Sequence, residues 1–203
     1  MAVTVSPPAN ALSLQLPRDI PLTVTAQQFA ALAAANRDLR LERTEHGQLI
    51  VNPPTGSEIG RKNAKILAQL GAWGEANAHL GEYFDSSTGF ALPNGAIRSP
   101  DASWVQKERW EALSPEQRKG FAPICPDVVL ELRSTTDPLT DLRAKMREYM
   151  EHGSQLGWLI DPEHERVEIY RPGQAVEIEE QPTHLSGEPV LPGFTLSLAR
   201  LWT

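Results

Sequence analysis

The sequence has one cysteine, few aromatic residues and no long apolar run, and these deficits narrow the classes of protein that it can encode. Cys125 cannot form an intrachain disulfide, and the N-terminus lacks the charged and apolar segments of a secretory signal, so we expect a protein of the reducing cytoplasm. Charged residues, glycine or proline interrupt every stretch before it reaches the roughly 18 apolar residues of a membrane helix. We therefore expect no membrane partner.

Two common kinds of cofactor site are also missing from the sequence. The five histidines are scattered and have neither the spacing of zinc ligands nor a neighbouring nucleophile. No glycine-rich phosphate-binding loop occurs, so a nucleotide cofactor is not indicated. The net charge of −7, from 19 Lys and Arg against 26 Asp and Glu, argues against a generally basic surface that coats nucleic acid but leaves room for a local basic site.

The first part of the chain predicts a leader followed by a small helix and a hairpin. Prolines at four positions predict a flexible leader over residues 1–21, and the rest, residues 22–203, is long enough for one core. An alanine-rich helix is expected at residues 25–36. Two short strands flanking Glu45-His46-Gly47 should form an antiparallel hairpin.

The later part of the chain alternates strands and helices. Short antiparallel strands are expected between residues 81 and 105, and the nearly continuous apolar run at residues 127–133 predicts a strand covered on both faces. A helix at residues 139–152 carries an apolar stripe, and strands follow at residues 158–160 and 166–171. The pattern predicts one α/β or α+β domain.

Two carboxylates on neighbouring predicted strands are the strongest chemical signal. Glu131 interrupts the most apolar strand, and Asp101 stands at the start of an earlier one. Burying an ionised carboxylate costs several kcal/mol unless it is paired or binds a cation, and Mg²⁺ prefers such oxygen ligands. The alternatives for Glu131 are a salt bridge to Arg133 or an edge position that faces solvent.

Candidate cations lie near these acids. Lys145 borders the apolar stripe of its predicted helix, between Leu142 and Tyr149, and is therefore expected to reach Glu131. The alternative is a lysine whose stem covers apolar surface while its ammonium stays in water. Arg133 supplies a second positive charge, but a guanidinium stays protonated and cannot act as a base.

Glu58 has two interpretations. Thr55 and Glu58 have the spacing of a capping box, which would bond the Glu58 carboxylate to the Thr55 amide at the start of a helix. If the carboxylate turns toward the sheet instead, Glu58 adds a third acid to the site.

Several of these residues stand in a familiar order: Glu58, Ser99-Pro100-Asp101, Pro126-Asp127-Val-Val-Leu-Glu131-Leu-Arg-Ser134, Lys145-Met-Arg-Glu-Tyr149 and Gly157-Trp-Leu-Ile-Asp-Pro162. From about Phe29 to Trp202 the chain resembles the Uma family of restriction endonuclease-like proteins, a branch of the PD-(D/E)XK nuclease superfamily. The resemblance implies a curved mixed β-sheet flanked by helices, with an N-terminal hairpin added to it. It also makes a homodimer plausible.

The resemblance implies roles for individual residues as well. Asp101 and Glu131 correspond to the acids that bind Mg²⁺, and Glu58 to a helix glutamate that joins the site. The superfamily has a lysine two residues after the second acid, whereas this chain has Arg133. Lys145 on the next helix is then the candidate replacement.

The leading hypothesis is an Mg²⁺-dependent endonuclease that hydrolyses DNA, with Mn²⁺ as an alternative cation. Asp101, Glu131 and the Leu132 carbonyl would hold the metal, and Lys145, with Arg133 as the alternate, would stabilise the attacking hydroxide or the transition state. The second hypothesis, favoured by the arginine at position 133, is a module that binds nucleic acid or protein without cleavage. A glycosidase with two catalytic carboxylates is a weaker third, because the chain shows no aromatic platform for a sugar.

Overall fold

A computed structural model describes residues 21–202, so the predicted leader lies outside the described residues except for its last position. The described chain begins with α1 (Ala26–Ala35), whose first turn is capped by Thr25 and Gln28, each bonding the other's backbone amide. A hairpin of β1 (Arg40–Arg43) and β2 (Leu49–Asn52) follows. Both the helix and the hairpin confirm the sequence prediction.

The hairpin belongs to a small sheet of its own. β1 also pairs with β5 (Ile97–Arg98), which pairs with β4 (Phe90–Ala91), so the strand order is β2-β1-β5-β4. Phe29 of α1 packs with Leu41 and Ile97 of this sheet. A short core thus holds the N-terminal extension together.

The central sheet has six strands in the order β10-β9-β8-β7-β6-β3. They are β3 (Gly81–Asp85), β6 (Ala102–Gln106), β7 (Val128–Leu132), β8 (Leu156–Asp161), β9 (Arg166–Tyr170) and β10 (Glu177–Glu180). β7 and β8 are parallel, whereas the other neighbours are antiparallel. The sheet is therefore mixed, as predicted, and β7 lies in its middle with all five residues buried.

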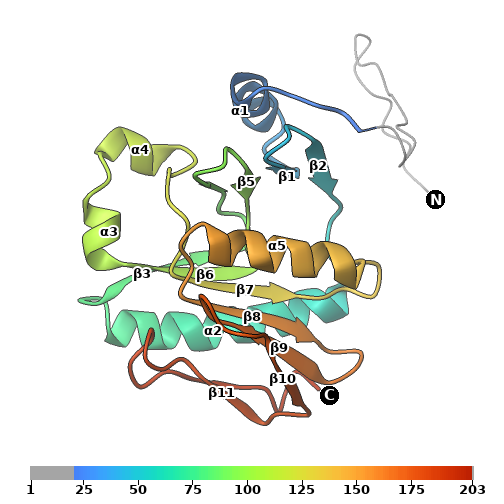
Figure 1. Ribbon diagram of the computed structural model, residues 1–203, viewed down its shortest axis with the longest axis vertical. Coiled ribbons are helices and arrows are strands. Elements are labelled where there is room, and N and C mark those ends of the chain that lie inside the picture. The colour runs from blue at the N-terminus through green and yellow to red at the C-terminus, as the bar shows by residue number, and fades with distance from the viewer. Residues whose placement is uncertain (1–20, 203) are drawn as a thin grey trace, which may run out of the picture.

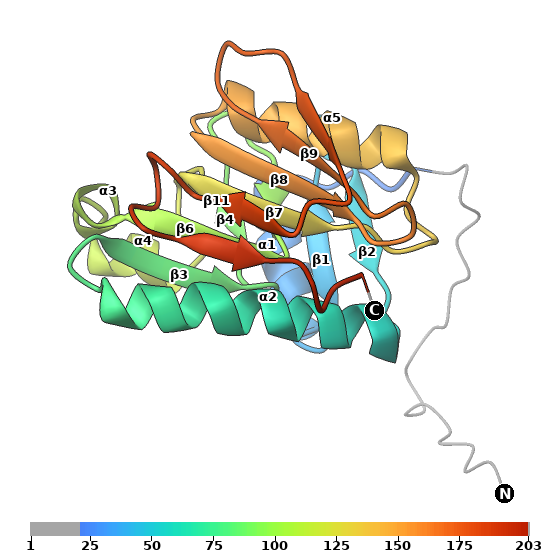
Figure 2. The same ribbon diagram turned by 90° about the horizontal axis from the view of Figure 1, so that it is seen from below.

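Helices cover both faces of this sheet (Figures 1 and 2). α2 (Ser57–Ala76) packs on one face through Ile66 and Leu70, and α5 (Leu139–Glu151) packs on the other through Met146 and Tyr149. The apolar stripe expected on the second helix is confirmed. Because side chains alternate along a strand, each residue of β7 faces one helix or the other.

The remaining elements extend this core. α3 (Lys107–Glu111) and α4 (Pro115–Lys119) connect β6 to β7, and β11 (His184–Ser186) pairs with β12 (Thr195–Ser197) beside α2. No helix within residues 21–202 is both long and apolar enough to span a membrane.

Candidate active site between the two sheets

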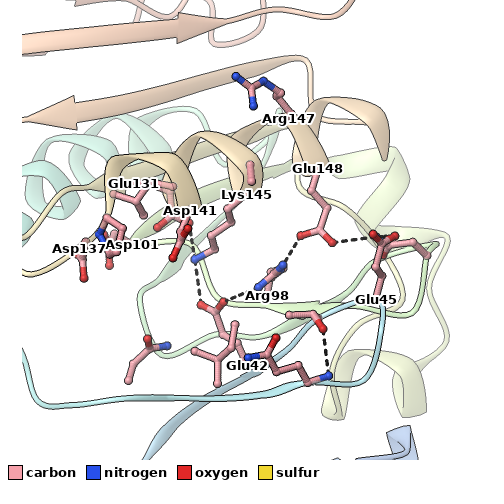
Figure 3. Close-up of a pocket in the computed structure, with 18 of the residues that line it drawn as sticks. Glu42, Glu45, Arg98, Asp101, Glu131, Asp137, Asp141, Lys145, Arg147 and Glu148 are labelled. Carbon is pink, nitrogen blue, oxygen red and sulfur yellow. Dashed lines mark hydrogen bonds and ion pairs between the residues drawn. The ribbon is translucent and has the colours of Figure 1, made fainter. Parts of the chain in front are cut away.

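A cleft of about 830 Å³ lies between the small sheet and α5, at the end of β7. Figure 3 shows that charged side chains from several elements converge there, among them Glu42 of β1, Arg98 of β5, Glu131 of β7 and Lys145 of α5. Asp101, directly before β6, lines the same cleft. The elements that meet here are far apart in the sequence.

Glu131 is buried on the α5 face of the sheet. Its neighbours Leu130 and Leu132 pack with the core on the α2 side, so alternation turns Glu131 the other way. The carboxylate is 3% exposed, accepts a hydrogen bond from the Tyr149 hydroxyl at 3.1 Å and pairs with Lys145 Nζ at 2.8 Å, all through Oε1. The two alternatives for Glu131, an edge position that faces solvent and a salt bridge to Arg133, were therefore both wrong.

Lys145 is held between two acids. Its ammonium lies 2.8 Å from Glu131 Oε1 and 2.9 Å from Glu42 Oε1, and it donates to the Ser99 carbonyl at 3.4 Å. An ammonium has three hydrogens, so these three acceptors account for all of them. The prediction that Lys145 reaches Glu131 is confirmed, and the lysine is buried rather than directed into water.

Glu42 is a site residue that sequence reasoning missed, as are Arg40 and Arg98. It accepts hydrogen bonds from Lys145 and from the Ser99 amide, and Arg98 lies 3.4 Å from its second oxygen. On a two-sided strand, the neighbour of the buried Leu41 should face solvent. Glu42 is buried instead, because the small sheet sits against the edge of the site, and local periodicity carries no signal for that contact.

Arg98 continues the network toward the rim of the cleft. Its Nε donates to Glu148 Oε2 at 2.6 Å, and Asn94 donates to Glu148 Oε1 at 2.9 Å. Arg98 therefore joins the Glu42 carboxylate to α5 a second time, alongside Lys145.

Asp101 is fixed to the end of β7. Its backbone amide donates to the Leu130 carbonyl, and its Oδ2 accepts the Leu132 amide at 2.9 Å. Its other oxygen pairs with Arg40 Nη1 at 2.9 Å. Ala102 packs on the α2 side of the sheet, so alternation places Asp101 on the same face as Glu131.

The electrostatics of the cluster separate its two buried glutamates. Burial raises the pKa of Glu131 to about 7, against the opposing effect of Lys145, and the charges of Asp101 and Glu42 raise it further. Burial also disfavours ionised Glu42, but Lys145 and Arg98 hold the pKa of Glu42 below its usual range. Pairs of carboxyl groups whose pKa values are pushed apart are typical of acid and base chemistry.

Arg133 and Glu58 line a neighbouring cleft of about 740 Å³ that shares Asp101 and Arg40 with the first. Arg133 turns away from Glu131 and pairs with Asp161 Oδ2 at 2.7 Å. These residues are near the candidate centre without contacting Glu131.

The capping-box interpretation of Glu58 was wrong. α2 begins at Ser57 with Gly56 as its N-cap, and no side chain caps it. The Glu58 side chain is 63% exposed and pairs with Arg61 and Lys62 on its own helix. It lines the second cleft and not the cleft that holds Glu131 and Lys145.

A second set of potential metal ligands adjoins Arg133. The ligand atoms of Asp161, Glu163 and His164 all lie within 4.8 Å of one another. Asp161 is buried, whereas the other two are exposed, and Arg133 Nη1 already pairs with Asp161 and Glu163. The predicted acids Asp101 and Glu131 lie outside this group.

Comparison with known proteins identifies the family. The family model Uma2, described as "Putative restriction endonuclease", matches residues 26–199. The chain belongs to the Uma2 family. The Uma2 fold is shared by the crystal structure described as "a putative nuclease belonging to DUF820 from Anabaena variabilis ATCC 29413", with a TM-score of 0.67 and 22% identity over 80% of this chain and 89% of that chain. A search of curated proteins found no match.

Membership of the Uma2 family, together with this fold, supports a nuclease function. The resemblance that the sequence suggested is confirmed, from the helix α1 to β12.

Because the pKa of Glu131 is raised, Glu131→Gln should increase the free energy of unfolding by an amount that grows with pH. The ordinary pKa of the side chain is 4.5 and the folded value is about 7, so the folded wild type loses stability as pH rises between these values. Glutamine does not ionise. Urea unfolding in EDTA should therefore show the variant gaining roughly 1–3 kcal/mol relative to wild type between pH 5 and pH 8. The exposed Glu177→Gln is the control, and an offset that is equal at both pH values would contradict the assignment.

Removing the shared cation should destabilise the protein. Lys145→Met leaves Glu42 and Glu131 buried without the ammonium between them, so we expect a loss of about 3–5 kcal/mol in the free energy of unfolding at pH 8. The double variant Lys145→Met/Glu131→Gln should recover part of this loss, because one buried charge is gone. Additive losses in the double variant would show that the two side chains do not interact.

Proposed function

We propose that this Uma2 protein hydrolyses DNA phosphodiester bonds with a bound Mg²⁺ or Mn²⁺ in the cleft beside α5. The observation that carries the proposal is the buried Glu131 carboxylate, with a buried lysine on one of its oxygens and Asp101 on the same face of the sheet. A structural ion pair needs no open cleft beside it. This pair lies in the wall of one.

The residues present fit a hard divalent cation. Both protein bonds to Glu131 use Oε1, and within residues 21–202 no hydrogen bond occupies Oε2. Asp101 offers a second carboxylate, and Leu132, whose carbonyl is the third proposed ligand, lines the same cleft. Oxygen donors of this kind are those that Mg²⁺ prefers.

A bound cation of this type lowers the pKa of a coordinated water and offsets charge on the phosphoryl group. The chain contributes position and charge. Tyr149 and Lys145 hold Glu131 in one orientation, and Glu42 and Arg98 in turn fix Lys145. Lys145 therefore directly contacts a proposed metal ligand, whereas Arg133 pairs with Asp161, which supports the assignment of Lys145.

In this proposal Arg133 and Glu58 act outside the metal site. Both line the second cleft, beside Asp101, where they would act on the part of the substrate strand that lies beyond the reacting phosphate. Arg133 pairs with Asp161 and stays protonated. In this proposal its positive charge would stabilise the substrate strand in the second cleft, and it would not act as a base.

A module that binds DNA without cutting it is the second candidate. The observation that favours it is that both carboxylates proposed as metal ligands already have a cationic partner, Arg40 on Asp101 and Lys145 on Glu131. A homodimer, expected from the family resemblance, and a cytoplasmic location, expected from the sequence, stay predictions. Sedimentation velocity would test the first.

Cleavage assays separate the two candidates. With Mg²⁺ or Mn²⁺, the wild type should cut at least one of single-stranded, duplex or branched DNA, and EDTA should stop it. Asp101→Asn and Glu131→Gln should abolish both cleavage and the calorimetric binding of the cation, because each removes a ligand charge. Lys145→Ala should abolish cleavage but retain cation binding, whereas Arg133→Lys should keep much of the activity.

Two outcomes would contradict the proposed mechanism. DNA binding without cleavage on every substrate and with either cation would favour the binding module. An active Lys145→Ala together with an inactive Arg133→Ala would instead reverse the roles of the two cations.

A further inference from the structure

Arg40 is the cation common to both clefts. It is the first residue of β1, its side chain is 29% exposed, and it lines the cleft beside α5 as well as the one beside α2. Its Nη1 donates to Asp101 Oδ1 at 2.9 Å. Burial disfavours its charge, but Asp101 and, more weakly, Glu131 and Glu42 keep the pKa of Arg40 raised.

Most N–H groups of the Arg40 guanidinium have no hydrogen-bond partner among the described residues. A guanidinium carries five N–H groups, and within residues 21–202 only the bond from Nη1 to Asp101 is found. Arg40 Nε is buried and has no hydrogen-bond partner among the described residues, a condition that is unfavourable when it persists. By contrast, Lys145, Arg98 and Arg133 each bond carboxylates on neighbouring elements.

The other cations that line the clefts are less well placed. Arg147 is exposed on α5, and Figure 3 shows it directed away from the cluster around Lys145. Lys62 lines only the second cleft, where Glu58 lies 3.7 Å from it. Of these cations, Arg40 alone lines both clefts and has N–H donors without partners among the described residues.

We propose that Arg40 contacts the reacting phosphate of the substrate, and that this contact replaces its bond to Asp101. This inference rests on the proposed function. A cation bound by Asp101 would offset the carboxylate charge that holds Arg40, and the guanidinium donors would then be available to an adjacent anion. A guanidinium fits phosphate oxygens with paired N–H groups and offsets charge that develops in the transition state.

A purely structural role of Arg40 would not produce opposite changes in the affinities for cation and oligonucleotide, so these two affinities test the proposal. If Arg40 competes with the cation for Asp101, Arg40→Gln should tighten Mn²⁺ binding in calorimetry by roughly twofold to tenfold, the strength of a partly exposed ion pair. The same substitution should weaken binding of an oligonucleotide in Ca²⁺ and reduce the slope of log affinity against log salt by about one. It should lower kcat with Mg²⁺ by about 10²–10³.

Two further variants complete the design. Arg40→Lys keeps the charge without the paired N–H geometry, so its kcat should fall between those of wild type and Arg40→Gln. Arg37→Gln, which removes an exposed arginine outside both clefts, should leave every reading unchanged. Melting temperatures in EDTA show whether Arg40→Gln is folded, and Arg40→Lys serves if it is not.

Opposite changes in the two affinities, tighter for Mn²⁺ and weaker for the oligonucleotide, support the proposal. Weaker binding of both would overturn it, because Arg40 would then merely hold Asp101 in place. An unchanged salt slope would overturn it as well. A wild type that binds neither Mn²⁺ nor any oligonucleotide would overturn the proposed function itself, and this inference with it.

Discussion

The ammonium of Lys145, shared between Glu42 and Glu131, is the contact on which the candidate site depends. Glu42 belongs to the small sheet, Glu131 to the central sheet and Lys145 to α5, so one buried cation joins three units of the fold. Two buried carboxylates at this distance from a common point would repel each other without it. The cleft keeps its shape because the charges that line it also hold its walls together.

The same balance shows how, under the proposed function, a protein with a net charge of −7 would present acids to a phosphate-containing substrate. Around the centre the cations are internal partners rather than a basic coat: Arg40 sits on Asp101, and Arg98 bridges Glu42 and Glu148. Under the proposed function, a divalent cation bound by the carboxylates would shift this balance locally and would leave cations without partners. Affinity for DNA would then be linked to occupancy of the site by the cation, which a permanently basic surface would not provide.

The sequence predicts most of the scaffold and only part of the site. The strand at β7 and the helix α5 are recognisable because their burial follows local periodicity, and this periodicity also places Glu131 and Lys145 on facing surfaces. Glu42 and Arg40 escape prediction because their partners lie 103 and 61 positions away, on α5 and directly before β6. The start of α2 was mispredicted for a smaller reason, since Gly56 rather than Thr55 is its N-cap.

Arg133 shows why a motif position does not fix a role. Two residues after Glu131 on a continuing strand, a side chain would share the face of Glu131. β7 ends at Leu132, however, and Arg133 bonds through its amide to the Ile160 carbonyl and through its guanidinium to Asp161, at the end of β8. The strand position at which the resemblance implies a lysine is thus tied to the neighbouring strand. The helix that covers Glu131 becomes the remaining surface from which an amine can reach it, and on α5 helical periodicity places Lys145 there, one turn before Tyr149.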